Sequence, residues 1–264
     1  MNKNNNCGKP VNNTFYLLEE NNLRKNIFLG SLSFGINLNN KEIDKVIEYL
    51  KIIKQYQKKV NITSTIDPLD IVFKHFLDSI SCVKFINYET KSGSRKKIID
   101  VGSGAGFPGI PIKIVLSKTT MVLLEARKNK KIFLETVLKQ LELKNTYVFQ
   151  ERAENFGKMI EHRENYHFVL SRAVASLGIL CEYCLPLCKL GGVMMAFKGS
   201  SYREELKPSF EVIERLGGCL ESINLMKNPH SEHVRSILII RKVKSTPDKY
   251  PRRNGIPMKR PLCF

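Results

Sequence analysis

The chain has 264 residues, and 42% of them are hydrophobic, which is enough to bury a large core in one or two domains. Its 43 Lys and Arg residues outnumber 25 Asp and Glu residues and give a formal net charge of +18. A surplus of that size favours a polyanionic partner, with RNA or DNA ahead of an anionic membrane. No apolar run reaches the ~18–20 residues of a membrane-spanning helix. The polar, Asn-rich start does not have the pattern of a signal peptide.

The cysteines indicate a reducing compartment. There are seven of them, an odd number, in a chain without an export signal, so we expect free thiols in the cytoplasm. Cys181, Cys184 and Cys188 are spaced closely enough to suggest a metal site. No second Cys pair or nearby His pair supplies the remaining ligands of a tetrahedral site. We therefore predict that these thiols pack in a core and that the protein holds no metal.

Composition and patterning divide the chain into four segments. We expect a mobile, Asn-rich leader with some local helix over residues 1–40 and a helical subdomain over residues 41–90. An α/β domain is predicted over residues 91–241. The last segment, residues 242–264, is rich in Lys, Arg and Pro and has no periodicity, so we expect an extended basic tail.

The subdomain over residues 41–90 begins with a periodic apolar pattern. Apolar residues recur at helical spacing, at Ile43, Val46, Ile47, Leu50 and Ile53. A second helix is predicted to begin at Asp67 and Pro68, because Asp caps a helix N-terminus well and proline suits the first helical position. A helical unit is therefore expected ahead of the α/β domain.

Short apolar runs then alternate with amphipathic helices, as in a parallel sheet with helices on both faces. The first five predicted strands lie near residues 97–101, 120–124, 145–149, 168–171 and 191–197. After a helix near residues 201–216, two apolar runs at 219–226 and 234–241 follow with no helix between them. They are predicted to pair as a hairpin, so that the last strand runs antiparallel. A Rossmann-like α/β sheet of seven strands with an antiparallel last strand is typical of class I methyltransferases that use S-adenosylmethionine, rather than of dehydrogenases.

A glycine-rich run, Asp-Val-Gly-Ser-Gly-Ala-Gly-Phe-Pro-Gly, starts at Asp100 at the end of the first predicted strand. Glycines there allow positive φ and let a ligand approach bare backbone, as in nucleotide and nucleoside sites. Counted from Gly102, the run matches the GxGxG of S-adenosylmethionine enzymes; counted from Gly104, it matches the GxGxxG of dinucleotide enzymes. Glu125 ends the next strand, where both classes place an acid on the ribose hydroxyls.

Two observations favour the first alignment. The strand runs directly into Gly102, and Asp100 at its end suits a cationic or amino-acid-bearing ligand. The residues after Glu125 include Arg127 and several lysines, which suit RNA better than a nicotinamide cofactor. An NAD(P)-dependent oxidoreductase remains one alternative. A non-catalytic RNA-binding assembly factor on a methyltransferase fold is another.

Several further motifs occur in the order seen in one bacterial family. Residues 100–111 are followed by Arg-Ala-Glu at 152–154, Ser-Arg-Ala-Val-Ala at 171–175 and Ala-Phe-Lys-Gly at 196–199. The motifs that extend the match on either side are residues 61–63, 67–68, 74–79 and 246–257. Over roughly residues 43–262 the chain thus resembles the bacterial ribosomal RNA small subunit methyltransferase G family, also called glucose-inhibited division protein B.

That resemblance implies transfer of a methyl group from S-adenosylmethionine to N7 of one guanine of 16S rRNA, near the decoding site. The partner would be 16S rRNA or the small ribosomal subunit, in the cytoplasm. Guanine N7 has a lone pair and no proton, so the reaction needs alignment of nucleophile and methyl donor rather than a general base. The sequence shows no His/Asp or Ser/His catalytic constellation, and no catalytic residue is assigned.

The resemblance also implies which residues hold the cofactor. From the methionine end through the ribose to the adenine, they are Gly102, Gly104, Phe107, Glu125, Ala126, Arg127, Ala153 and Glu154. Arg172 ends the fourth predicted strand and is expected over the methyl donor, where it would contact the cofactor carboxylate or the substrate.

The RNA is expected to bind largely through its phosphates. Lys198 is one candidate contact, and others come from the linker 91–97, the face formed by residues 127–131 and the basic tail. The chain departs from the family pattern at His167, where the family usually has an acid.

Overall fold

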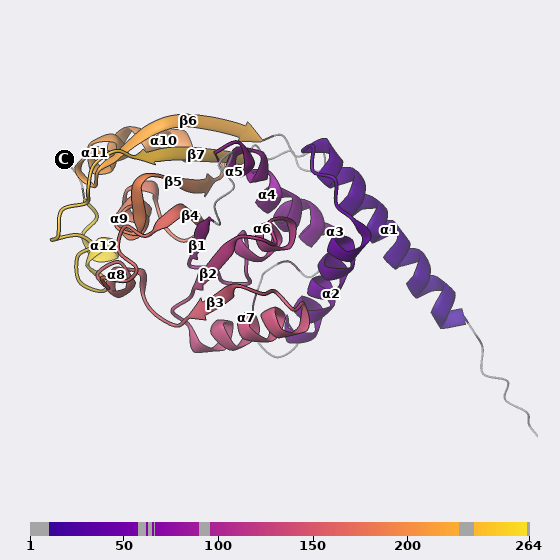
Figure 1. The fold of residues 1–264 in the computed structure, drawn as a ribbon. Helices are drawn as coiled ribbons and strands as arrows, with labels where there is room; N and C mark the ends of the chain where they lie inside the picture. The colour runs from indigo at the N-terminus through magenta and orange to yellow at the C-terminus, as the bar shows by residue number, and fades with distance from the viewer. Residues whose placement is uncertain are drawn as a thin grey trace, which may run out of the picture.

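The computed structural model describes residues 11–57, 62, 65, 67–89, 96–226 and 235–262, with side chains from Glu19 onward. A seven-stranded sheet in the order β3-β2-β1-β4-β5-β7-β6 forms the centre of the α/β domain (Figure 1). The strands are β1 (Lys97–Val101), β2 (Thr120–Leu124), β3 (Thr146–Phe149), β4 (Tyr166–Arg172), β5 (Cys188–Lys198), β6 (Gly218–Met226) and β7 (Arg235–Lys242).

The pairing of these strands confirms the predicted architecture. β1 to β5 pair in parallel, and β7 runs antiparallel to both β5 and β6. The hairpin expected from the last two apolar runs is therefore present, and its second strand inserts between β5 and β6. Because β1 to β5 are parallel, their carboxyl ends meet at one edge of the sheet, where α/β folds place their ligands.

Helices cover both faces of the sheet (Figure 1). In chain order they are α1 (Val11–Ser33), α2 (Asn40–Gln57), α3 (Pro68–Ile71), the π-helical turn η1 (Val72–Phe76), α4 (Leu77–Ile80), α5 (Val83–Glu89), α6 (Gly109–Val115), α7 (Lys128–Gln140), α8 (Ala153–Phe156), α9 (Leu177–Cys184), α10 (Tyr202–Leu206), the 3₁₀ turn η2 (Lys207–Ser209), α11 (Phe210–Arg215) and α12 (Ile256–Lys259). The sheet divides the hydrophobic core into two parts, one on each face, as two neighbouring residues of β1 show. Ile98 packs with the N-terminal helices, α6 and α7, whereas Ile99 packs with α9 and α11 on the other face.

The second helix of the N-terminal unit begins where the sequence predicted. The Asp67 side chain accepts a hydrogen bond from the backbone N–H of Asp70 at 2.9 Å, and Pro68 occupies the first turn. The helix then widens into the π turn η1 before it continues as α4. Such π turns are frequent at functional sites, and this one carries His75.

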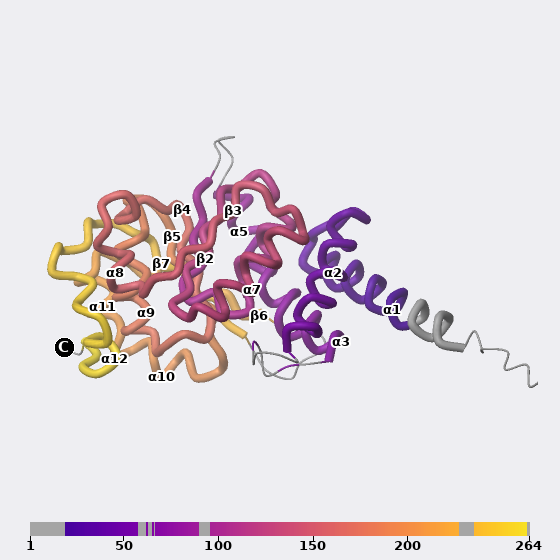
Figure 2. The backbone as a smooth tube through the Cα atoms, turned by 90° about the horizontal axis from the view of Figure 1, so that it is seen from below, coloured from indigo at the N-terminus to yellow at the C-terminus, as the bar shows by residue number. Residues whose placement is uncertain are grey.

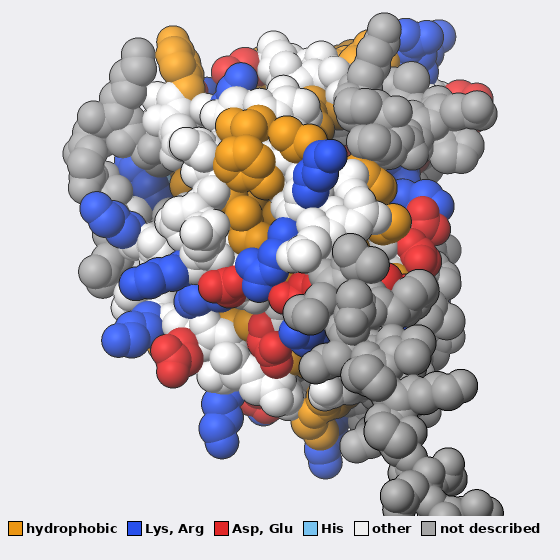
Figure 3. All heavy atoms as spheres, turned by 90° about the vertical axis from the view of Figure 1, so that its right-hand side faces the viewer, with side chains coloured by type: hydrophobic (Ala, Val, Ile, Leu, Met, Phe, Trp, Pro, Cys, Tyr) orange, Lys and Arg blue, Asp and Glu red, His pale blue; other side chains and the backbone are white. Residues whose placement is uncertain are grey.

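The helix in the first forty residues is longer than the local helix expected of a leader, and it packs against the domain. α1 occupies Val11–Ser33, and its described part packs against the N-terminal unit through Ile27, which is fully buried. Figures 1 and 2 both show α1 running along α2 at one end of the molecule. Figure 3 looks onto that end and shows hydrophobic and basic side chains side by side. Among the side chains of α1 that the structure describes, the large apolar ones that are exposed are Phe28, Leu29 and Leu32. Residues 1–10 lie outside the described part of the chain.

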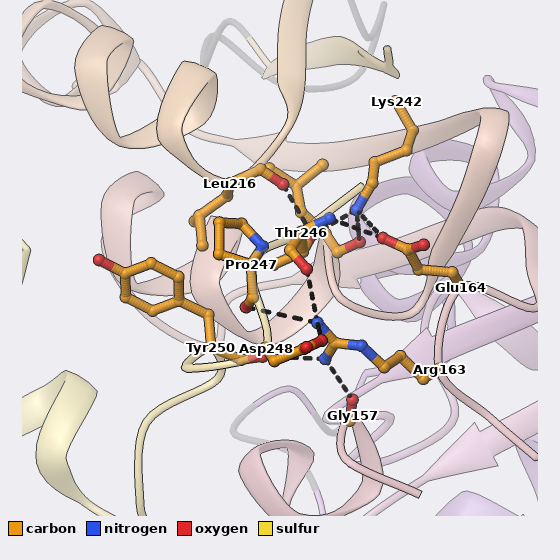
Figure 4. Close-up of polar contacts among 10 residues, drawn as sticks. Gly157, Arg163, Glu164, Leu216, Lys242, Thr246, Pro247, Asp248 and Tyr250 are labelled. Atoms are coloured by element: carbon orange, nitrogen blue, oxygen red, sulfur yellow. Dashed lines mark hydrogen bonds and ion pairs between the residues drawn. The ribbon is translucent and has the colours of Figure 1, made fainter. Parts of the chain in front are cut away.

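The basic tail also differs from expectation, because it folds back onto the domain. Figure 4 shows Arg163 reaching into the first turn of the tail. Its guanidinium donates to the backbone carbonyls of Gly157, Thr246 and Tyr250 at 3.1, 2.7 and 2.9 Å. Next to it Lys242 is buried and forms an ion pair of 3.0 Å with Glu164. The sequence of the tail shows no periodic pattern because the residues that hold it in place lie far from it along the chain.

The three clustered thiols lie in the core, as their apolar surroundings predicted. Cys181, Cys184 and Cys188 are buried, and burial raises the pKa of Cys181 and of Cys188 to about 12. Within the described residues, no group of three or more His, Cys, Asp or Glu side chains is placed to hold a metal ion. None of the described helices has the length and apolar character needed to cross a membrane.

Candidate cofactor and substrate site

The glycine run forms a tight turn at the carboxyl end of β1. Gly102, Gly104 and Gly106 have φ values of 74°, 58° and 93°, in the left-handed region that glycine adopts without strain. The N–H groups of Gly102 and Ser103 both donate to the carbonyl of Leu124, which ties the turn to the end of β2. A Cβ on Gly102 would lie 2.6 Å from a methyl carbon of Val174, so the turn has no room for a side chain there.

A cavity of about 400 Å³ opens beside this turn, at the ends of β1, β2 and β3. Six of the predicted cofactor residues line it together: Gly102, Glu125, Ala126, Arg127, Ala153 and Glu154. Residues that the sequence reasoning missed also line it, including Tyr183 of α9 and Met258 of α12. The tail therefore contributes one wall of the cavity, which no local signal in the sequence indicated.

Glu125 is held at the rim of this cavity by backbone groups. Its Oε2 accepts a hydrogen bond from the N–H of Gly104 at 2.9 Å, and its Oε1 accepts one from the N–H of Arg127, also at 2.9 Å. Gly104 does not line the cavity itself but fixes this carboxylate. Each carboxylate oxygen has a second lone pair, so Glu125 can still accept hydrogen bonds from ligand hydroxyls.

Asp100 lies beneath the turn and is fully buried. Its Oδ2 accepts a hydrogen bond from the N–H of Gly109 at 3.0 Å, whereas Oδ1 has no partner among the described residues. Burial raises the pKa of Asp100 to about 7, against the opposing effect of the hydrogen bond from Gly109. A buried acceptor without a partner is costly, and it makes the base of the turn receptive to a hydrogen-bond donor or a cation.

Phe107 lies behind the turn rather than in the cavity. Its ring stacks on His75 with a centroid distance of 5.1 Å and contacts Tyr49 at 5.4 Å. The Tyr49 hydroxyl donates to the carbonyl of Ala105, inside the glycine run. The N-terminal helices α2 and η1 thus support the turn, through the ring of Phe107 and through the hydrogen bond of Tyr49 to Ala105.

A second cavity, of about 790 Å³, adjoins the first at the end of β4. Ala173 and Val174 line both cavities, so the two spaces meet at these residues. Ala173 has a φ of 54°, a conformation that is uncommon for a residue with a side chain. Arg172 and Lys198, the two predicted substrate-positioning residues, both line the second cavity.

Arg172 is engaged by the N-terminal unit and does not line the first cavity. Its guanidinium forms an ion pair of 3.0 Å with Asp78 and donates to Nδ1 of His75 at 2.6 Å. It also donates to the carbonyls of Lys74 and His75. Burial, followed by the charge of Arg172, lowers the pKa of His75 to about 4, so this imidazole is a neutral acceptor. Arg172 therefore joins the N-terminal helices to the sheet.

Lys198 is likewise paired within the protein. Its ammonium forms an ion pair of 2.7 Å with Glu205 and donates to the carbonyl of Ala175 at 2.7 Å. The same carboxylate accepts from the N–H of Leu177 and so caps α9. The Lys198 ammonium, which was predicted to contact phosphate, is thus paired with the carboxylate that caps the N-terminus of α9. His167, where the family usually has an acid, lies near the amino end of β4, and its Nδ1 accepts from the N–H of Lys97 at 3.2 Å.

The seven-stranded order with an antiparallel β7, together with a cavity over the glycine turn, defines a class I methyltransferase. The residues present fit S-adenosylmethionine, a cationic nucleoside that carries an amino acid. They offer bare glycine backbone, the Glu125 carboxylate held by backbone N–H groups, and one oxygen of the buried Asp100, Oδ1, that has no partner among the described residues. The family model described as rRNA small subunit methyltransferase G matches residues 42–235. The chain belongs to the ribosomal RNA small subunit methyltransferase G family.

Curated relatives extend the match beyond the family model. The Acetivibrio thermocellus ribosomal RNA small subunit methyltransferase G is 42% identical over 240 residues, which cover 91% of this chain and 97% of that protein. The Bacillus velezensis protein of the same name is 39% identical, covering 89% and 97%. Among solved structures, the Pyrococcus horikoshii TYW2 complex with MeSAdo aligns with a TM-score of 0.48 and 15% identity over 61% of each chain.

Proposed function

We propose that the protein transfers the methyl group of S-adenosylmethionine to N7 of one guanine of 16S rRNA, near the decoding site, in the cytoplasm. The observation that carries this proposal is the junction of two cavities at Ala173 and Val174. A donor in the smaller cavity and a base in the larger one would meet there. Membership of the methyltransferase G family supports the same substrate class.

The predicted cofactor residues keep their roles in this proposal. Gly102 provides bare backbone for the methionine end, and Glu125 accepts from the ribose hydroxyls, with Ala126 and Arg127 beside it. The adenine lies against the remaining predicted residues of the cavity, Ala153 and Glu154. Phe107 and Gly104 act indirectly: the first supports the turn from behind, and the second fixes the Glu125 carboxylate.

The second cavity is built for positioning rather than for proton transfer. Three of the potential bases that line it are occupied, because His75 and Asp78 bind Arg172 while Glu205 binds Lys198; the fourth, Glu204, is exposed to solvent. Guanine N7 needs no base: its lone pair attacks the methyl carbon, the carbon–sulfur bond breaks, and the sulfonium leaves as a neutral thioether. S-adenosylmethionine supplies an already activated methyl group, so the residues contribute alignment and exclusion of water.

The RNA partner follows from charge. The net charge of +18 suits a polyanion. Of the expected phosphate contacts, Arg127 and Lys128 are exposed beside the first cavity. The linker 91–97 lies mostly outside the described residues. The 16S rRNA, bare or within the small subunit, is the proposed substrate, and its affinity is expected to fall steeply with salt.

Two assays test the proposal together. S-adenosylmethionine, and not NAD(H), should raise the melting temperature of the purified protein. Labelled S-adenosylmethionine should then transfer its methyl group to under-methylated small subunits. Protection by NAD(H) alone would favour an oxidoreductase, and cofactor binding without transfer to any RNA would favour a non-catalytic assembly factor.

A further inference from the structure

Arg235, the first residue of β7, lines the second cavity and was not singled out by any sequence motif. The next residue of the strand, Ser236, pairs in register with Lys198 at the end of β5. One guanidinium nitrogen of Arg235 lies 3.9 Å from the point that a Cβ on Gly199 would occupy. Arg235 therefore stands across the cavity mouth at the ends of β5 and β7.

The other cations of this cavity are already neutralised. Arg172 is paired with Asp78 at 3.0 Å, and Lys198 is paired with Glu205 at 2.7 Å. Within the part of the chain that the structure describes, the Arg235 guanidinium has no hydrogen bond or ion pair, although it lines the same cavity. Glu204 also lines it but is exposed, so water and salt screen its charge.

The charge of Arg235 acts on the interior of the cavity. After burial and Arg172, it is the next cause that lowers the pKa of His75. It also lowers the pKa of Arg172, behind the larger effect of burial. Two guanidinium groups thus face one space, and only one of them has a carboxylate partner. An anion placed there would relieve the repulsion between them.

We propose that Arg235 binds a phosphate group of the target nucleotide and thereby seats the guanine at the junction of the two cavities. A guanidinium matches phosphate with two parallel hydrogen bonds, whereas the Lys198 ammonium is already paired with Glu205 and the carbonyl of Ala175. The inference rests on the proposed function, because the anion it assigns belongs to the RNA substrate. Arg235 is a substrate-binding residue in this account, and the methyl donor is bound without it.

The test compares three variants of the full-length protein. Arg235→Gln removes the positive charge, and Arg235→Lys keeps the charge but cannot form two parallel hydrogen bonds to a phosphate. The control, Arg203→Gln, removes an exposed charge from α10, outside the cavity. Each variant is assayed for methyl transfer to under-methylated small subunits, for its KM and kcat, for the dependence of subunit binding on KCl, and for its affinity for S-adenosylmethionine. Melting temperatures show whether each variant is folded.

Arg235→Gln should raise KM for the subunit about tenfold. It should also reduce the slope of log affinity against log salt by about 0.7–0.9, the value for one phosphate. Arg235→Lys should keep the slope and raise KM less, and neither Arg235 variant should change the affinity for S-adenosylmethionine. Arg203→Gln should behave as wild type.

Three results would overturn the inference alone, given an active wild type. The first is an unchanged KM and salt slope in Arg235→Gln. The second is a fall in its kcat at constant KM. The third is a loss of its affinity for S-adenosylmethionine as large as its loss of affinity for the subunit. If Arg235→Gln does not fold, an Arg235→Lys variant with a smaller salt slope than wild type overturns it. A wild-type protein that methylates no guanine N7 overturns the proposed function, and this inference with it.

Discussion

Arg163 offers the sharpest test of how the tail is held. Replacing Arg163 with methionine keeps most of the aliphatic volume and removes the guanidinium that donates to the carbonyls of Gly157, Thr246 and Tyr250. Those carbonyls then have no donor from this side chain. The change should release the tail from the domain while leaving the sheet intact.

The size of the effect follows chiefly from the hydrogen bonds to these three carbonyls, at 3.1, 2.7 and 2.9 Å. A fourth hydrogen bond, to the carbonyl of Pro247, is 3.4 Å long and adds less. At about 0.5–1.5 kcal/mol net for each bond, their loss should lower the free energy of unfolding by about 3 kcal/mol. The ion pair of Arg163 with Asp248 adds little, because it is 3.7 Å long and Asp248 is fully exposed. The loss cannot exceed the free energy with which the tail docks.

The assay is urea denaturation followed by circular dichroism, since the chain has no tryptophan to report by fluorescence. Arg253→Met is the matched control, because Arg253 is exposed in the same tail. Affinity for S-adenosylmethionine should also fall in Arg163→Met, since the tail supplies Met258 to the cavity and the Gly255 N–H to Glu154. Equal stability and equal cofactor affinity in the two variants would refute the reasoning.

Three further changes probe the site. Glu125→Gln places an amide nitrogen against a backbone N–H, so the affinity for S-adenosylmethionine measured by calorimetry should fall at least tenfold. An unchanged affinity would refute the proposed contact of Glu125 with the ribose. Gly102→Ala should abolish cofactor binding, whereas Gly191→Ala should leave it intact. Both glycines have a φ of 74°, but of the two only Gly102 lacks room for a Cβ. Equal cofactor binding by the two variants would contradict this. The folded pKa of His75 is about 4 against a usual 6.5, so the unfolded chain takes up a proton first on acidification. The free energy of unfolding should therefore fall by about 3 kcal/mol between pH 7 and pH 4. The variant His75→Gln keeps a hydrogen-bond acceptor for Arg172, and urea titrations should show a smaller fall for it. An unchanged pH profile would count against a neutral imidazole.

Local patterns predicted the sheet because each strand is an apolar run between turn residues. β1 and β2 begin and end at the predicted residues, and the absence of a helix before β7 was enough to predict its antiparallel direction. The Asp67 cap was equally readable, since it depends on contacts within one helical turn. Six of the predicted cofactor residues line one cavity because strand ends converge in any parallel sheet.

What the sequence did not predict depends on contacts between distant residues. Arg172 and His75 are 97 residues apart, and the partners of Arg163 in the tail are 83 and 87 residues away from it. No periodicity or spacing marks such pairs, so the sequence did not predict that α1 and the tail pack against the domain. Lys198 was a candidate phosphate contact, and the sequence did not indicate that Glu205 lies beside it in the fold.

The most direct test of the central claim is to map the product on the RNA. Under-methylated small subunits are incubated with the protein and labelled S-adenosylmethionine. The RNA is then reduced and cleaved with aniline, which breaks the chain at 7-methylguanosine. The account predicts incorporation of about one methyl group per subunit and a single cleavage at a guanine of 16S rRNA near the decoding site. Absence of transfer, or a label on any atom other than guanine N7, would contradict it.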